Sequence, residues 1–201
     1  QAGMKYVVLA TKHIDGFCLF DSKLPHYDSM GTPFKRDVLK ELAAAVREAG
    51  LQRCAYYSGS DYHHPDYCPL GPGSSWPRVA QQSATADFKR YQEYMSGQLR
   101  ELLTNYGPLG VLWFDACYDQ TPAQLQAAEL VQMMRNLQPT LIINNRLNVP
   151  LDFDTPEQFI PPTGIAGRDW ETCMTMNDTW GFKKDDHNWK STQVLLRNLI
   201  D

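Results

Sequence analysis

The sequence lacks the features that mark several broad classes of protein. Its 201 residues contain no apolar run approaching the roughly 18 residues needed to cross a bilayer. They contain no basic block, and 19 Lys and Arg against 23 Asp and Glu leave a net charge of −4. That charge balance is unlike a nucleic-acid-binding surface. We therefore expect neither a membrane partner nor a nucleic-acid partner.

Cysteine is present, but in no recognisable framework. The five cysteines are odd in number, scattered and without a CxxC pair. This pattern argues against a zinc ribbon or a small disulfide scaffold and leaves the redox compartment open. The chain starts at Gln1 and reaches an apolar strand pattern almost at once. We therefore expect it to start inside a domain.

Glycine-rich phosphate loops are also missing. Neither GxGxxG nor GxxxxGK[ST] occurs, whereas a doubly wound nucleotide-binding sheet should carry such a turn after its first strand. Hydrophobic residues at 43% and charged residues at 21% fit an ordinary globular protein. The length fits one domain on a prior of about 150 residues each.

Strand patterns alternate with helix patterns along the chain. The expected strands cover residues 5–13, 54–58, 110–115 and 141–145, with a possible further strand at 171–176. The expected helices cover residues 36–49, 88–103, 121–137 and from about 191 onward, and Asp37 is the expected cap of the first. Thr121 and Gln124 form a capping-box pattern at the start of the third helix. A loop rich in His, Pro, Gly and Ser should run to about Pro77.

This alternation predicts parallel βαβ units, in either a doubly wound sheet or a (β/α)8 barrel. Polar or aromatic residues end strand after strand, which is the barrel-enzyme pattern. These are His13, Tyr56, Asp115 and Arg146. Because a whole barrel takes about 250 residues, we predict an α/β fold, a (β/α)8-like TIM barrel that is incomplete in this chain.

Asp115 is the first candidate for chemistry, because it ends an apolar strand beside Trp113. A carboxylate there could simply cap a turn, but the neighbouring indole favours a sugar site. Glycoside cleavage needs a second carboxyl group, about 5 Å away for retention or about 6.5–9.5 Å for inversion. Glu157, on a Pro-rich loop, and Glu171 are the candidates. Either could instead be a solvated acid or part of a structural ion pair.

Histidines are the other candidates. His13 could be a core histidine or a functional one, with the two readings evenly balanced. The loop over residues 60–67 holds two His and two Asp. However, adjacent His63 and His64 would point to opposite sides of a strand, and no HExxH-like spacing supports them. We therefore predict no metal site, and we favour contact with substrate over a plain surface loop.

Several stretches, in chain order, match one known family. They are KYVVLATKHIDGFCLF (5–20), RD (36–37), AVREAG (45–50), YYSGSDYHHPDY (56–67), LWFD (112–115), DFDTPE (152–157) and WETCMTMNDTWG (170–181). Together they resemble the α-L-fucosidases of glycoside hydrolase family 29. The resemblance implies a (β/α)8-like barrel, usually followed by a small β-sandwich, that hydrolyses terminal α-L-fucose with retention and without metal or cofactor.

The resemblance also bears on domain, partner and location. It implies that residues 1–201 are a fragment of the catalytic barrel domain, without the first strands, the last strands or the β-sandwich. It implies a fucosylated oligosaccharide or glycoprotein glycan as partner, and a periplasmic, secreted or lysosomal location.

Carried over by position, the resemblance makes Asp115 the nucleophile and Glu157 the general acid/base, with Glu171 in reserve. The sugar-binding residues it implies are His13, Tyr56, Trp113 and Arg146, with Trp113 stacking on the sugar. The alternatives are a non-catalytic fucose-binding or truncated inactive barrel, and a metal-dependent barrel hydrolase.

Overall fold

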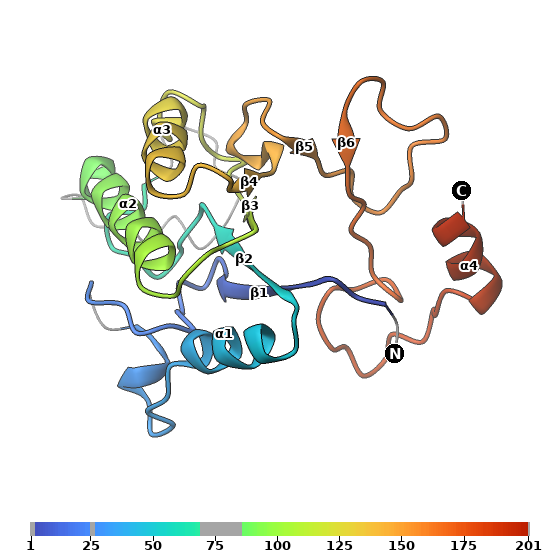
Figure 1. Ribbon diagram of the computed structural model, residues 1–201, viewed down its shortest axis with the longest axis horizontal. Helices are drawn as coiled ribbons and strands as arrows, with labels where there is room; N and C mark the ends of the chain where they lie inside the picture. The colour runs from blue at the N-terminus through green and yellow to red at the C-terminus, as the bar shows by residue number, and fades with distance from the viewer. Residues whose placement is uncertain (1–2, 25–26, 69–85, 201) are drawn as a thin grey trace. The chain divides into compact units, whose positions relative to one another are not determined.

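The computed structural model describes residues 3–24, 27–68 and 86–200 (Figure 1). Most of the loop expected to run to Pro77 lies outside this range. The chain divides into two compact units, Gln1–Val149 and Pro150–Asp201. Each unit is described by itself below.

The first unit is built on a four-stranded parallel sheet. The strands are β1 (Tyr6–Lys12), β2 (Gln52–Ser58), β3 (Val111–Asp115) and β4 (Ile142–Ile143), and each pairs with the next in chain order. A doubly wound sheet reverses its strand order at a switch point, and these four strands show no reversal. The predicted parallel α/β architecture is confirmed, in the sequential order that a barrel also uses.

Three helices follow the strands, and Figure 1 shows them on one side of the sheet. They are α1 (Val38–Glu48), α2 (Phe88–Thr104) and α3 (Ala127–Leu137). The Asp37 side chain caps α1 by accepting from the Lys40 amide at 2.9 Å, as its sequence position predicts. Gly50, with φ at +66°, follows that helix in the left-handed conformation that glycine adopts without steric cost.

Side-chain alternation along the strands decides what faces the helices. Tyr57 and Phe114 are fully buried and meet edge to face at 6.1 Å. The Tyr57 hydroxyl donates to Gln98 of α2 at 2.8 Å, so this side of the sheet is the core. The preceding residues, Tyr56 and Trp113, therefore point to the opposite side, and the strand register pairs them directly.

Two predicted element boundaries are wrong. The expected capping-box hydrogen bonds join Thr121 and Gln124, at 2.7 and 3.3 Å, but they close a turn and not the helix. Gln126 adopts a left-handed conformation with φ at 50°, and α3 begins only after it. The strand expected at 171–176 is absent, because the short strand lies earlier, at Asp169–Trp170.

The second unit carries little regular structure. Strand β5 (Phe153–Asp154) pairs in parallel with β6 (Asp169–Trp170), and α4 (Thr192–Ile200) forms the last helix, close to its predicted start. Arg168 binds the Asp154 carboxylate with two nitrogens, at 2.9 and 3.1 Å. Several large hydrophobic side chains of this unit are more than half exposed: Phe159, Met176, Trp180, Phe182, Trp189 and Leu196.

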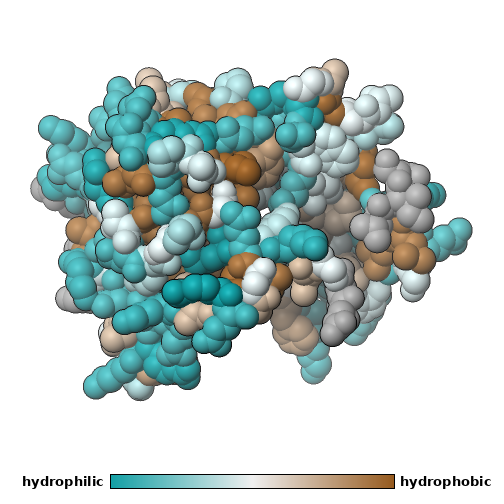
Figure 2. Space-filling model, viewed as in Figure 1, coloured by the Kyte–Doolittle hydropathy of each residue, from teal (hydrophilic) through white to brown (hydrophobic). Residues whose placement is uncertain are grey.

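The surface view separates polar from apolar regions. In Figure 2 the surface over α2 and α3 is mainly hydrophilic, with small hydrophobic patches between polar residues. This is the expected outer face of amphipathic helices that bury their other side. None of the helices within the described residues is long and apolar enough to cross a membrane.

Candidate active site

Aromatic rings form a ladder across the carboxyl ends of the strands. His13, directly after β1, stacks on Tyr56 of β2 with ring centroids 5.5 Å apart and planes 5° from parallel. Tyr56 stacks on Trp113 of β3 at 5.7 Å and 16°. The Arg146 guanidinium, in the 3-10 helix Asn145–Leu147 after β4, lies 4.6 Å from the Trp113 ring centroid. Consecutive strand ends thus each supply one group.

Asp115 receives hydrogen bonds from three side chains at the end of this ladder. The Tyr56 hydroxyl donates to Oδ2 at 2.7 Å. The Tyr118 hydroxyl and the Arg146 guanidinium donate to Oδ1 at 2.7 and 2.8 Å. The Asp115 side chain is 18% exposed and that of Arg146 is 12% exposed, so the ion pair is partly shielded from water.

These contacts keep the carboxylate ionised. Burial raises the pKa of the Asp115 carboxyl. Hydrogen bonds from Tyr56, Tyr118 and the Ala116 backbone, together with the positive charge of Arg146, lower that pKa by more, so the net pKa lies below the ordinary value. Burial and the hydrogen bond to Asp115 raise the pKa of Tyr56. Tyr56 therefore remains a neutral donor, and Asp115 remains an anion.

The backbone behind Asp115 is held in a sharp turn. Ala116 has φ at 52° and is buried, an uncommon conformation for a residue other than glycine. The Gly59 amide donates to the Asp115 carbonyl at 2.7 Å, and the Ser60 hydroxyl donates to the Ala116 carbonyl. A Cβ on Gly59 would lie 2.3 Å from the Cys117 sulfur, so only glycine fits at this approach.

A buried ion pair lies at the end of β1. The Lys12 ammonium lies 3.2 Å from Asp61 Oδ2, with the two side chains 0% and 1% exposed, and 4.4 Å from the centroid of the Tyr57 ring. Asp61 Oδ1 accepts from the backbone amides of His63 and His64, at 3.1 and 2.9 Å. This pair joins the end of β1 to the loop after β2.

In the loop over residues 60–67, the histidine and aspartate side chains contact other residues of the same unit. His63 stacks on Tyr27 with centroids 3.7 Å apart, and His64 packs on Tyr94 at 4.4 Å. Asp66 pairs with Arg90 of α2. Within the described parts of the chain, no group of three or more His, Cys, Asp or Glu side chains is arranged to hold a metal ion.

Both candidate partner acids lie in the second unit. Glu157 follows β5 and forms an isolated parallel bridge with Cys173. Glu171 follows β6, and its amide donates to the Asp154 carbonyl at 2.9 Å. The structure thus brings His13, Tyr56, Trp113, Asp115 and Arg146 together in one unit, and it places the two acids on the paired segments of the other.

Sequence reasoning missed Tyr118 and the pair of Lys12 and Asp61. Tyr118 lies three residues after Asp115, in a turn with no periodic pattern, so only its closeness in the chain could have suggested it. Lys12 lies inside an apolar strand pattern, where burial of a charge signals a partner. The sequence does not say which of its acids that partner is.

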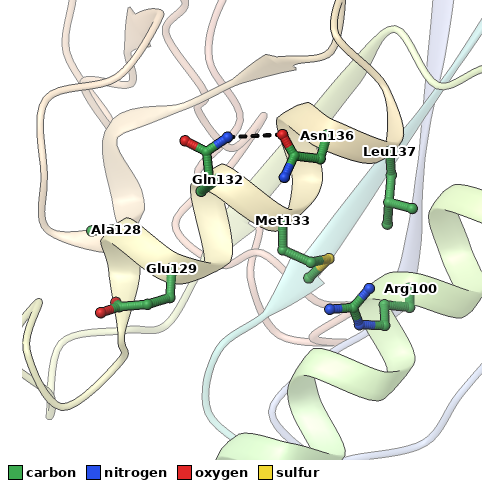
Figure 3. Close-up of a pocket in the computed structure, with 7 residues that line it drawn as sticks. All are labelled: Arg100, Ala128, Glu129, Gln132, Met133, Asn136 and Leu137. Atoms are coloured by element: carbon green, nitrogen blue, oxygen red, sulfur yellow. Dashed lines mark hydrogen bonds between the residues drawn. The ribbon is translucent and has the colours of Figure 1, made fainter.

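A separate surface cavity of about 590 Å³ lies between α2 and α3. Figure 3 shows Arg100 of α2 reaching toward the α3 side chains, among which Gln132 donates to Asn136 at 2.8 Å. Among the described residues that line it, Glu129 carries the one carboxylate. The cavity lies among helix side chains, so it is separate from the ladder at the strand ends.

The carboxylate and the stacked aromatic rings lie at the carboxyl ends of parallel strands, which is where α/β barrel enzymes place their active sites. The family model described as Alpha-L-fucosidase matches residues 1–201. The chain therefore belongs to the α-L-fucosidase family, whose members are glycoside hydrolases.

Individual relatives agree with this assignment. Alpha-L-fucosidase isoenzyme 1 from Paenibacillus thiaminolyticus superposes with a TM-score of 0.89 at 44% identity, over 99% of this chain and 52% of its own. AlfC from Lactobacillus casei, in complex with α-L-fucose product, superposes with a TM-score of 0.76 at 33% identity, over 97% of this chain and 63% of its own. The human plasma alpha-L-fucosidase is 26% identical over 100% of this chain and 43% of its own length. The chain thus spans about half the length of these relatives.

Proposed function

We propose that this chain carries the catalytic site of a retaining exo-α-L-fucosidase. The observation that carries the proposal is the Asp115 carboxylate, held ionised by Tyr56, Tyr118 and Arg146 at the end of the aromatic ladder. Family membership supports fucose as the sugar. The four sequential parallel strands account for half of an eight-stranded barrel, and we propose that residues 1–201 belong to such a catalytic barrel domain.

In the proposed first step, Asp115 attacks the anomeric carbon of terminal α-L-fucose. An Asp115–carbon bond forms as the glycosidic bond breaks, and Glu157 donates a proton to the departing oxygen. In the second step Glu157 takes a proton from water, and the resulting attack releases Asp115 as a carboxylate. Two inversions give net retention. The role of Glu157 rests on its place in the family pattern, and Glu171 is the second candidate for it.

The ladder supplies the proposed sugar platform. Tyr56 and Trp113 stack on each other beside Asp115, and Trp113 is 6% exposed. From the family pattern we propose that Trp113 contacts the sugar. His13 and Arg146 supply polar hydrogens for fucose hydroxyl groups. AlfC is described in complex with Fuca(1,6)GlcNAc and with 4-nitrophenyl-a-L-fucopyranoside, so we propose a fucosylated glycan as substrate here too.

The native protein that carries this chain provides the test. It should hydrolyse 4-nitrophenyl α-L-fucoside, and proton NMR should detect α-L-fucose as the first product. β-L-Fucose as the first product would overturn the retaining mechanism. Fucose binding without turnover would instead support the alternative of a non-catalytic fucose-binding protein, and loss of activity with a chelator would support a metal-dependent hydrolase.

A further inference from the structure

The two oxygens of Asp115 are held unequally. Oδ1 accepts from Tyr118 at 2.7 Å and from Arg146 at 2.8 Å, whereas Oδ2 accepts from Tyr56 at 2.7 Å. Among the side chains of the described residues, these three are the donors to the carboxylate. The same Arg146 nitrogen also lies 3.3 Å from the Tyr118 oxygen, so Tyr118, Arg146 and Oδ1 form one cluster.

Tyr118 is held in place by its turn. The Asn148 side-chain amide donates to the Cys117 carbonyl at 2.7 Å and to the Gln120 carbonyl at 2.8 Å. These carbonyls flank Tyr118 on both sides. Tyr118 as a whole is 65% exposed, yet its hydroxyl is directed at the carboxylate. An exposed tyrosine whose polar end binds a partly buried anion is well placed to act on that anion.

We propose that Tyr118 is a positioning residue that holds Oδ1 and promotes release of Asp115 in the second step of the reaction. The proposal rests on the function proposed above. Oδ2, which accepts from one side chain where Oδ1 accepts from two, forms the bond to the anomeric carbon, and Oδ1 becomes the carbonyl oxygen of the resulting ester. When water attacks, the carbon–Oδ2 bond breaks and its electron pair returns to the carboxylate, whose charge both oxygens share.

The hydrogen bond from Tyr118 changes in strength along this path. An ester carbonyl is neutral, and a hydrogen bond to it is weaker than one to a carboxylate oxygen. The bond from Tyr118 to Oδ1 therefore strengthens as Asp115 leaves, so it stabilises the transition state more than the covalent intermediate. Interactions of this kind accelerate a chemical step. Loss of the hydroxyl should lengthen the life of the fucosyl-enzyme.

The lifetime of the intermediate tests this. The native protein that carries this chain is reacted with 2-deoxy-2-fluoro-fucosyl fluoride, excess donor is removed, and intact mass spectrometry follows loss of the bound sugar. Tyr118→Phe keeps the ring and removes the hydroxyl. It should lengthen the lifetime about tenfold, which is the scale of one hydrogen bond to a charged group. Tyr6→Phe, at the start of β1, is the matched control and should leave the lifetime unchanged.

The outcomes separate the two proposals. An adduct on the wild-type protein with a lifetime unchanged or shortened in Tyr118→Phe would overturn the role of Tyr118 and leave the proposed function intact. Absence of any adduct on wild type would overturn the covalent mechanism itself. Unchanged melting temperatures of both variants would show that a longer lifetime comes from the hydroxyl and not from loss of structure.

Discussion

At the scale of single residues, Asp115 shows how a partly buried acid stays charged. Burial alone would favour the neutral form, but Tyr56, Tyr118 and Arg146 each donate a hydrogen bond to the carboxylate, which favours the ionised form. The arrangement depends on residues from three separate segments of the chain. Replacing any one of the donors should therefore change the pKa and the reactivity of Asp115 while the fold is retained.

The pH dependence of kcat/KM tests the first donor. Because Tyr56→Phe removes a hydrogen bond that lowers the pKa of Asp115, that pKa should rise toward its ordinary value. As the proposed nucleophile, Asp115 must be ionised, so activity should be lost as pH falls through its pKa. The acid limb of kcat/KM should then move to higher pH. An acid limb unchanged from wild type, in a variant that keeps its melting temperature, would contradict this.

The two proposed catalytic acids should fail differently when removed. Asp115→Gly loses the attacking group, so every fucoside should suffer, and azide should give the inverted β-fucosyl azide. Glu157→Ala loses protonation, so a substrate with a very good leaving group should still form the intermediate, and azide should give the retained α-azide. Product NMR distinguishes the two azides. Rescue by azide in Glu171→Ala and not in Glu157→Ala would transfer the acid/base role to Glu171.

The sequence identified candidate residues at strand ends, which the structure brings together, but it did not identify the residues that contact them. Asp115 and Trp113 could be found because an acid beside an indole at the end of an apolar strand is unusual. Tyr118 could not, since an exposed aromatic in a turn has many ordinary explanations. Its contact with Asp115 depends on the left-handed turn at Ala116, and alanine carries no sequence signal for that conformation.

At the scale of elements, the contact of Gly59 with Cys117 joins the loop after β2 to the turn after β3. In Gly59→Ala the new Cβ would lie 2.3 Å from the Cys117 sulfur, so the turn after Asp115 must shift. We expect a loss of about 1–3 kcal/mol in unfolding free energy, as for other overpacked sites. Denaturant unfolding measures it.

The double variant supplies the control. Cys117→Ala removes the sulfur that the new methyl group meets, so Gly59→Ala should cost less in that background than alone. Equal costs in the two backgrounds would show that the contact does not constrain the turn.

The buried pair of Lys12 and Asp61 joins the end of β1 to the loop after β2. Lys12→Met leaves the Asp61 carboxylate buried without its cation, which typically costs about 3–5 kcal/mol. Asp61→Asn added to Lys12→Met removes the unpaired charge and should recover part of that loss. Denaturant unfolding of both variants checks this, and a double variant no more stable than Lys12→Met would refute it.

Element boundaries were predictable where local chemistry acts alone. The Asp37 cap of α1 and the apolar strand patterns need only neighbouring residues, and both were found. The start of α3 was not, because the hydrogen bonds of Thr121 and Gln124 form in a turn as readily as in a helix. The second unit was the hardest to predict, since its two-residue strands are too short to show alternation.

At the scale of the whole molecule, the outer strands of the sheet are the exposed ones. Within the described residues, β1 and β4 each pair with one neighbouring strand, and only the end of β1 is further bridged, by Cys18. Partly unpaired edge strands and exposed apolar side chains favour association. On the proposal that residues 1–201 belong to a larger catalytic barrel domain, the 201-residue chain expressed alone should bind a hydrophobic dye and melt with low cooperativity. A dye-free monomer with a single sharp melt would count against this expectation.

The most direct test of the central claim is to locate the sugar in the trapped intermediate. The native protein that carries this chain is labelled with 2-deoxy-2-fluoro-fucosyl fluoride, digested, and sequenced by tandem mass spectrometry. One fluorofucosyl group is expected, attached to the side chain of Asp115. Attachment to Glu157 or Glu171, or fluoride release without any covalent label, would contradict it.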